Sequence, residues 1–189
     1  LALNINLGDS PMATAYSKAL TTYRSAGLSQ PFAVISSPPD EGSILSQPHF
    51  DASCALAKSL SSIEGVVPQS LQGIAFDVAY ADGGKITCIS VTEAKRRLDT
   101  DAYYLRRFRA LTNVTARADL ITFVPGFNPF GSRTELFVSA VRECIENITS
   151  LRSPQTTFQF YSASSTEVDA KNFTFARLPG AVIGSLVLI

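Results

Sequence analysis

Large apolar residues recur at every second position at the start of the chain, namely Leu1, Leu3, Ile5 and Leu7. This period of two predicts a β-strand with one buried face. Short apolar runs bounded by turn-forming residues predict further strands. The expected strands span Leu1–Leu7, Phe32–Ile35, Asp119–Val124, Phe158–Tyr161, Phe173–Phe175 and Ala181–Ile189.

A tight turn divides two more β-forming stretches, Ile74–Tyr80 and Lys85–Val91. The four residues between them are Ala81-Asp82-Gly83-Gly84. Asp-Gly is typical of short hairpin turns, because both residues tolerate the positive φ angles that such turns need. The pattern therefore predicts a β-hairpin.

Apolar residues spaced three or four apart predict about four helices. Met12–Ala26 follows Ser10 and Pro11, a typical helix N-terminus, and Phe50–Ile63 shows a similar apolar spacing. Thr134–Ile148 has the clearest amphipathic pattern. Its expected buried stripe is Leu136, Phe137, Ala140, Val141, Cys144, Ile145 and Ile148.

The order of these elements predicts an α+β fold with a mixed or antiparallel sheet. Residues 1–189 are few enough for a single compact domain, and a hydrophobic content of 46% can fill its core. Two Cys-bearing helices, around Cys54 and Cys144, leave an internal duplication as an alternative. No apolar run approaches the roughly 20 residues that span a bilayer, so we expect a soluble protein without a membrane partner.

Positive charge is concentrated in one segment of a chain whose net charge is zero. Val91–Arg117 contains seven basic and three acidic residues, a net charge of +4. The basic residues are Lys95, Arg96, Arg97, Arg106, Arg107, Arg109 and Arg117. Arginines predominate, which suits bidentate contacts to phosphate, although a solvated helix face would have the same composition.

Two helices are expected within this segment, divided at Asp99-Thr100-Asp101. In the second, Ala102–Leu111, the apolar side chains lie on one face and the arginines largely on the other. In the first, Glu93 and Arg96 are three residues apart and share a face, as an ordinary surface ion pair also would. Tyr80 and either Tyr103 or Tyr104 could act as platforms on which a base stacks.

Most catalytic classes lack their signature in this sequence. His49 is the only histidine, and its position favours a residue at a helix entry over a catalytic base. There is no nucleophile elbow of the G-x-S-x-G type, and Gly83-Gly84-Lys85 fits a hairpin turn better than a phosphate loop. The cysteines are too dispersed for a metal motif, so we expect neither a metal nor a cofactor.

Three cysteines, Cys54, Cys88 and Cys144, allow one disulfide and leave one thiol. Three N-x-T sequons begin at Asn113, Asn147 and Asn172. They would accept glycans only in a secretory compartment, and the sequence does not decide the compartment.

Three separate stretches resemble the ribosome-inactivating proteins, which are rRNA N-glycosylases. LNINLGDSPMATAYSKALTTYRSAG resembles the opening strand and helix of that family, and CISVTEAKRRL is similar to its E-A-x-R helix. TTFQFYSASSTEVDAKNFTFARLPGAVIGSLVLI resembles its closing strands and apolar tail. Together the pieces cover about a third of the chain.

The resemblance implies an adenine N-glycosylase acting on ribosomal RNA. Glu93 would stabilise the oxocarbenium-like ribosyl group and help to activate water, and Arg96 would support protonation of the leaving adenine. Tyr80 and Tyr103 would sandwich the extruded base. The expected contacts to the RNA backbone come from Arg97, Arg106, Arg107 and Arg109.

The chain is shorter than the usual domain of that family, and it departs from the family pattern in two further respects. Tyr103 follows the E-A-x-R helix, whereas the second tyrosine of the family precedes it, and the chain has no tryptophan. The catalytic carboxylate could instead be Glu143 or Glu146. The competing hypotheses are a non-enzymatic assembly subunit of the coat or linker type and a secreted binding protein.

Overall fold

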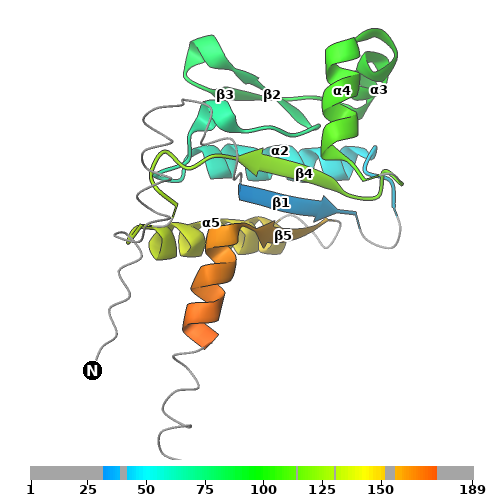
Figure 1. The fold of residues 1–189 in the computed structure, drawn as a ribbon. Helices are drawn as coiled ribbons and strands as arrows, with labels where there is room; N and C mark the ends of the chain where they lie inside the picture. Colours follow the sequence, from blue (N-terminus) through cyan, green and yellow to red (C-terminus); the bar gives the residue numbers. More distant parts are fainter. Residues whose placement is uncertain (1–31, 39–41, 114, 130, 152–155, 174–189) are drawn as a thin grey trace, which may run out of the picture.

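The fold is α+β, with two small antiparallel sheets and helices packed around them. The computed structural model describes residues 32–38, 42–113, 115–129, 131–151 and 156–173. The predicted strands Leu1–Leu7 and Ala181–Ile189 and the predicted helix Met12–Ala26 lie outside these ranges. Figure 1 shows the hairpin and two helices in a layer above the larger sheet, with α2 behind that sheet.

The larger sheet has the order β4–β1–β5, and both pairings are antiparallel. Its strands are β1 (Phe32–Ser37), β4 (Asp119–Phe123) and β5 (Thr157–Tyr161). In β1 and β4 every second residue is buried, as expected for strands with one face in the core. The register aligns these buried positions as Phe32 with Phe123, Val34 with Ile121, and Ser36 with Asp119.

Two helices cover the buried face of this sheet, α2 (Gln47–Ser61) and α5 (Thr134–Leu151). Phe137 of α5 packs edge-on against Phe32, with 5.4 Å between the ring centroids. Phe32 in turn stacks on Phe123 at 5.7 Å. The buried residues of α2, which include Phe50, complete the core.

A second layer consists of the hairpin β2 (Phe76–Ala79) and β3 (Lys85–Cys88), followed by helices α3 (Val91–Thr100) and α4 (Ala102–Leu111). The hairpin prediction is confirmed, although both strands are shorter than expected. Val91 starts α3 instead of ending a strand, because the Ser90 hydroxyl caps that helix. Gly83 and Gly84 in the turn both have positive φ.

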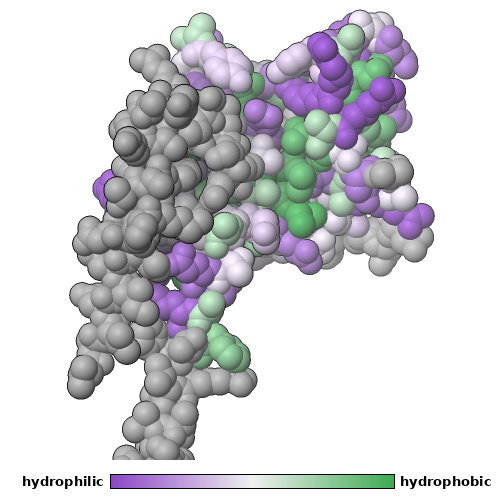
Figure 2. Space-filling view, in the orientation of Figure 1, coloured by the Kyte–Doolittle hydropathy of each residue, from purple (hydrophilic) through white to green (hydrophobic). Residues whose placement is uncertain are grey.

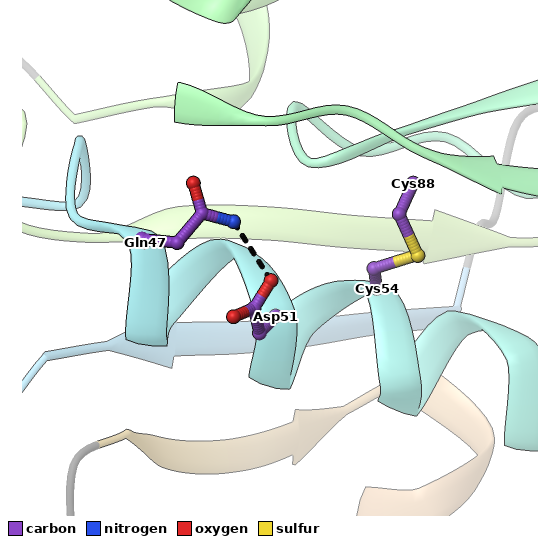
Figure 3. The surroundings of a disulfide bond; sticks show 4 residues. All are labelled: Gln47, Asp51, Cys54 and Cys88. Carbon is purple, nitrogen blue, oxygen red and sulfur yellow. Dashed lines mark hydrogen bonds between the residues drawn. A yellow bond between two sulfur atoms is a disulfide. The ribbon is translucent and has the colours of Figure 1, made fainter. Parts of the chain in front are cut away.

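Helix α2 anchors this second layer to the core through a disulfide, drawn in Figure 3, and through a hydrogen bond accepted by Gln47. Cys54 of α2 and Cys88 of β3 form a disulfide. Gln47 at the start of α2 accepts a hydrogen bond from the Val91 backbone N–H through Oε1 and donates from Nε2 to Asp51. The start of α3 is therefore fixed to α2 by a side chain as well as by the nearby disulfide.

Two predictions were wrong. Phe173 lies in a helix over residues 163–173 and not in a strand. That helix starts where Ser162 and Ser165 cap each other, each hydroxyl accepting a hydrogen bond from the other's backbone N–H. In α5, Leu136 is 77% exposed and Val138 is buried, so the buried stripe consists of Phe137, Val138, Val141 and Ile145.

We expect loss of the Cys54–Cys88 disulfide to destabilise the fold markedly. The bridge closes a loop with a sequence separation of 34 residues, for which chain entropy predicts a loss of about 3–4 kcal/mol on reduction. Urea denaturation of the oxidised and reduced protein measures this difference. Cys144→Ser is the matched control. Because the Cys144 thiol is free, this substitution should change the urea midpoint little. Equal midpoints for oxidised and reduced protein would contradict the expectation.

Candidate nucleic-acid interface

Helices α3 and α4 carry most of the predicted site, and side-chain caps set where each begins. The Ser90 hydroxyl accepts from the Glu93 backbone N–H at the start of α3. Asp101 ends α3 and caps α4, since its carboxylate accepts from the backbone N–H groups of Tyr103 and Tyr104. The predicted division at this aspartate is therefore confirmed.

The structure brings Glu93 and Arg96 together. The Arg96 guanidinium donates from Nη2 to Oε1 at 2.7 Å and from Nε to Oε2 at 2.8 Å, a bidentate pair. Arg97 donates from Nε to Oε1 of the same carboxylate at 2.6 Å. Hydrogen bonds from Arg96 and Arg97 lower the pKa of Glu93 to about 2, so the carboxylate is ionised at neutral pH.

Asp77 of β2 joins the hairpin to both helices. Its two carboxylate oxygens accept from Arg97 Nη1 at 2.6 Å and from Arg107 Nη2 at 3.0 Å. Both guanidinium groups also lie against the ring of Tyr104, at 5.8 and 5.0 Å from its centroid. Arg97 and Arg107 therefore hold the second layer together and do not project freely into solvent.

Tyr104 is a core residue of this layer. It is buried, and its hydroxyl donates to the backbone carbonyl of Ile74 at 2.7 Å. Burial raises the pKa of its phenol to about 12. Of the two adjacent tyrosines, Tyr103 alone, at 66% exposure, has a ring face available to a ligand.

The exposed face of α4 carries positive charge and no acid. Its exposed residues are Ala102, Tyr103, Arg106, Arg109 and Ala110. Within the described ranges, neither of the two arginines forms an ion pair. Figure 2 shows hydrophilic side chains gathered over α3 and α4 at the upper right. This face is thus distinct from the paired arginines beneath it.

The structure does not bring Tyr80 and Tyr103 together. Tyr80 is 68% exposed in the short 3-10 turn η4 (Tyr80–Asp82), at the end of the hairpin. It lies three residues beyond Asp77, which is about 10 Å along a strand. Figure 1 shows this turn on the side of the upper layer away from α3 and α4. The two rings therefore cannot sandwich one base in this arrangement.

The alternative carboxylates, Glu143 and Glu146, both lie on the exposed side of α5. Neither forms an ion pair with an arginine in the described part of the chain; the neighbouring Arg142 pairs with Asp169 at 2.7 Å. The sequence suggested no arginine partner for them, and the structure supplies none among the residues it describes.

A buried polar cluster lies where the core face of the sheet meets α2. His49 Nε2 is 2.6 Å from Asp119 Oδ1 and 3.2 Å from the Ser36 hydroxyl, which itself donates to Asp119 Oδ1 at 2.6 Å. Ser53 and Thr156 lie at the edge of the cluster, 3.4 Å from Ser36 Oγ and His49 Nδ1 respectively. Sequence reasoning missed this cluster, although it placed His49 correctly at a helix entry.

The geometry of this cluster is not that of a catalytic triad. A triad histidine contacts its nucleophile through one ring nitrogen and its carboxylate through the other. Here Ser36 and Asp119 both lie against Nε2, and all three residues are buried. Asp119 Oδ2 is also buried and has no hydrogen-bond partner among the described residues. The cluster is therefore a structural feature that joins α2 to the sheet.

An open pocket of about 260 Å³ lies elsewhere, between the end of α2, Phe127 and α5. Phe127, Leu136 and Phe137 supply apolar walls, and Glu64 and Arg133 form an ion pair of 3.4 Å beside it. None of the predicted site residues lines this pocket. In the described ranges, His, Cys, Asp and Glu form no group that could hold a metal ion, and no helix is long and apolar enough to cross a membrane.

Comparison of the sequence with known protein families and with curated proteins finds no match to either.

We expect His49→Ala to destabilise the protein by about 3–5 kcal/mol, because it leaves the Asp119 carboxylate buried beside a cavity. Urea denaturation measures the loss. Glu64→Ala is the matched control: it removes an ion pair whose side chains are 92% and 72% exposed, and should change stability by less than about 1 kcal/mol.

A second variant distinguishes two contributions to this loss of stability: the missing partner of Asp119 and the cavity left by the imidazole. Adding Asp119→Asn to His49→Ala removes the unpaired buried charge and should recover part of the stability. Similar losses for His49→Ala and Glu64→Ala would show that the buried pair is not an important contact.

Proposed function

We propose that this protein binds single-stranded or looped RNA through the exposed face of α4. The observation that carries the proposal is that Tyr103, Arg106 and Arg109 are exposed together on this face. No acidic side chain among the described residues pairs with them. Arginine binds phosphate in bidentate fashion, and an exposed tyrosine offers a face for base stacking.

The surroundings of this face support RNA binding. Ala102 and Ala110 are small exposed residues, so a nucleic-acid backbone can approach the helix closely. Unstacked bases of single strands and loops are the part of RNA that aromatic side chains can reach. Beneath this face, Arg107 holds α4 to Asp77, and Arg97 holds α3 to the same carboxylate.

We also propose that the protein acts in an oxidising compartment, as a secreted protein would. The Cys54–Cys88 disulfide supports this, because such bonds persist outside the reducing cytosol.

Removal of the two exposed arginines should weaken RNA binding and its dependence on salt. For Arg106→Ala/Arg109→Ala, the slope of log affinity against log salt should fall by about 1.4, since each phosphate contact to a single strand contributes roughly 0.7. Fluorescence anisotropy with a labelled single-stranded RNA at several salt concentrations measures both quantities. Arg133→Ala, an exposed arginine beside the distant pocket, is the matched control.

Tyrosine variants distinguish RNA from other polyanions in the same assay. Tyr103→Ala should lose about 1–3 kcal/mol of RNA affinity and Tyr103→Phe should retain it, because stacking needs the ring and not the hydroxyl. Equal binding of sulfated polysaccharide, with no effect of Tyr103→Ala, would assign the face to that ligand. An oligomer that binds neither would instead favour the assembly-subunit hypothesis.

Adenine N-glycosylase activity is the second candidate function, and the Glu93–Arg96 pair favours it. An oxocarbenium-like ribosyl group is stabilised by an ionised carboxylate, and the arginines keep Glu93 ionised. Arg96 is 61% exposed, so its guanidinium is accessible to a base. Tyr103 could stack with such a base from one side only, because Tyr80 is on a distant turn.

The glycosylase candidate is tested by adenine release from ribosomes. We expect release by the wild type and a loss on the order of 10²-fold or more in Glu93→Gln, since the charge that stabilises the transition state is gone. Arg96→Ala should also lose activity, while Arg133→Ala should not. If adenine release survives both substitutions, the catalytic carboxylate would be assigned to Glu143 or Glu146 instead. No release by folded wild type would exclude the activity and leave the RNA-binding proposal standing.

A further inference from the structure

We infer that Asn113 is a site of N-linked glycosylation. It begins the sequon Asn-Val-Thr in the connection between α4 and β4, and its side chain is exposed. The sequon alone is a weak pattern. The inference rests on how the side chains of Asn113 and Thr115 are held in the folded protein.

The asparagine side chain has separate roles for its two polar atoms. Oδ1 accepts hydrogen bonds from the backbone N–H groups of Arg117 and Ala118, at 2.8 and 3.1 Å. Nδ2 donates to the Thr115 hydroxyl at 3.0 Å. The sequon's amide and hydroxyl are therefore drawn together on an exposed turn.

This arrangement can carry a glycan without losing a hydrogen bond. The amide nitrogen has two hydrogens, and only one is needed for the bond to Thr115. A sugar that replaces the other leaves the Thr115 contact and both contacts of Oδ1 intact. The backbone bond from the Asn113 N–H to the Ala118 carbonyl, at 3.0 Å, is also unaffected.

The modification takes its sugar from a lipid-linked oligosaccharide diphosphate through the oligosaccharyltransferase of the secretory pathway. A bond forms between Nδ2 and C1 of the first sugar as the bond from C1 to the diphosphate oxygen breaks. The lipid diphosphate leaves with the electron pair, and Nδ2 loses one proton. The Cys54–Cys88 disulfide is compatible with passage through the oxidising compartment in which this transfer occurs.

The sequon at Asn147 lacks this geometry. Asn147 lies in α5, where the Thr149 hydroxyl donates to the Ile145 carbonyl of its own helix instead of facing the asparagine. Asn172 is in the helix over 163–173, and the third residue of its sequon lies outside the described ranges. Between Asn113 and Asn147, Asn113 is therefore the position at which the folded chain better accommodates a glycan.

The test is expression of the chain through the secretory pathway of a eukaryotic cell, followed by peptide-N-glycosidase digestion and peptide mass spectrometry. We expect a mobility shift on digestion and conversion of the asparagine at position 113 to aspartate. Asn113→Asp should lose this glycan yet keep the two acceptor contacts of Oδ1, so it controls for folding. Thr115→Ala should lose the glycan, Thr115→Ser should retain it in part, and Asn147→Gln should leave it unchanged.

A chain that enters the pathway, forms its disulfide and still carries an unmodified asparagine at position 113 would overturn the inference. The glycan should be measured on protein retained inside the cell as well as on secreted protein, so that the result is decisive even when secretion is poor. Modification at Asn147 or Asn172 alone would also overturn it. RNA binding by protein made without glycans is a separate measurement, so failure of either proposal leaves the other open.

Discussion

The contact between His49 and Asp119 fixes the position of α2 on the sheet, and the rest of the structure depends on that placement. Asp119 enters the core because the sheet register pairs it with Ser36 at the end of two apolar rows. A lone carboxylate there would be strongly destabilising, so the histidine and the serine hydroxyl must both reach it. Helix α2 then carries Gln47 and Cys54, which secure the hairpin and the start of α3.

The arginines of α3 and α4 divide into two groups with different roles. Arg97 and Arg107 contact Asp77 and the Tyr104 ring, and these ion pairs and ring contacts hold their guanidinium groups in place. The buried Nε of Arg107 has no hydrogen-bond partner among the described residues, so this packing is stabilised by the remaining contacts of the guanidinium. Arg106 and Arg109 are left on the outer face. Net charge alone therefore overstates how much of the segment can bind an anion.

Local sequence patterns predicted most of the secondary-structure elements, but they did not predict the long-range pairings between those elements. The Asp-Gly turn, the break at Asp101 and the helical position of His49 follow from the chemistry of neighbouring residues. The Ser36–Asp119 alignment depends on strands 83 residues apart, and no local signal contains that register. Likewise, the separation of Tyr80 from Tyr103 follows from the direction of the hairpin, which periodicity does not specify. The Glu93–Arg96 pair was predictable because it lies within one helical turn.

A glycan at Asn113 would restrict how RNA approaches α4. Asn113 lies just beyond the C-terminal end of the helix, and that end is about 12 Å along the axis from Tyr103. Arg109 lies in the last turn of the helix, next to Asn113, and would be crowded by the glycan, whereas Tyr103 and Arg106 remain accessible. Stacking and one phosphate contact can then occur together at the N-terminal half of the helix. An RNA ligand of the glycosylated protein must therefore approach from the Asp101 end of the helix.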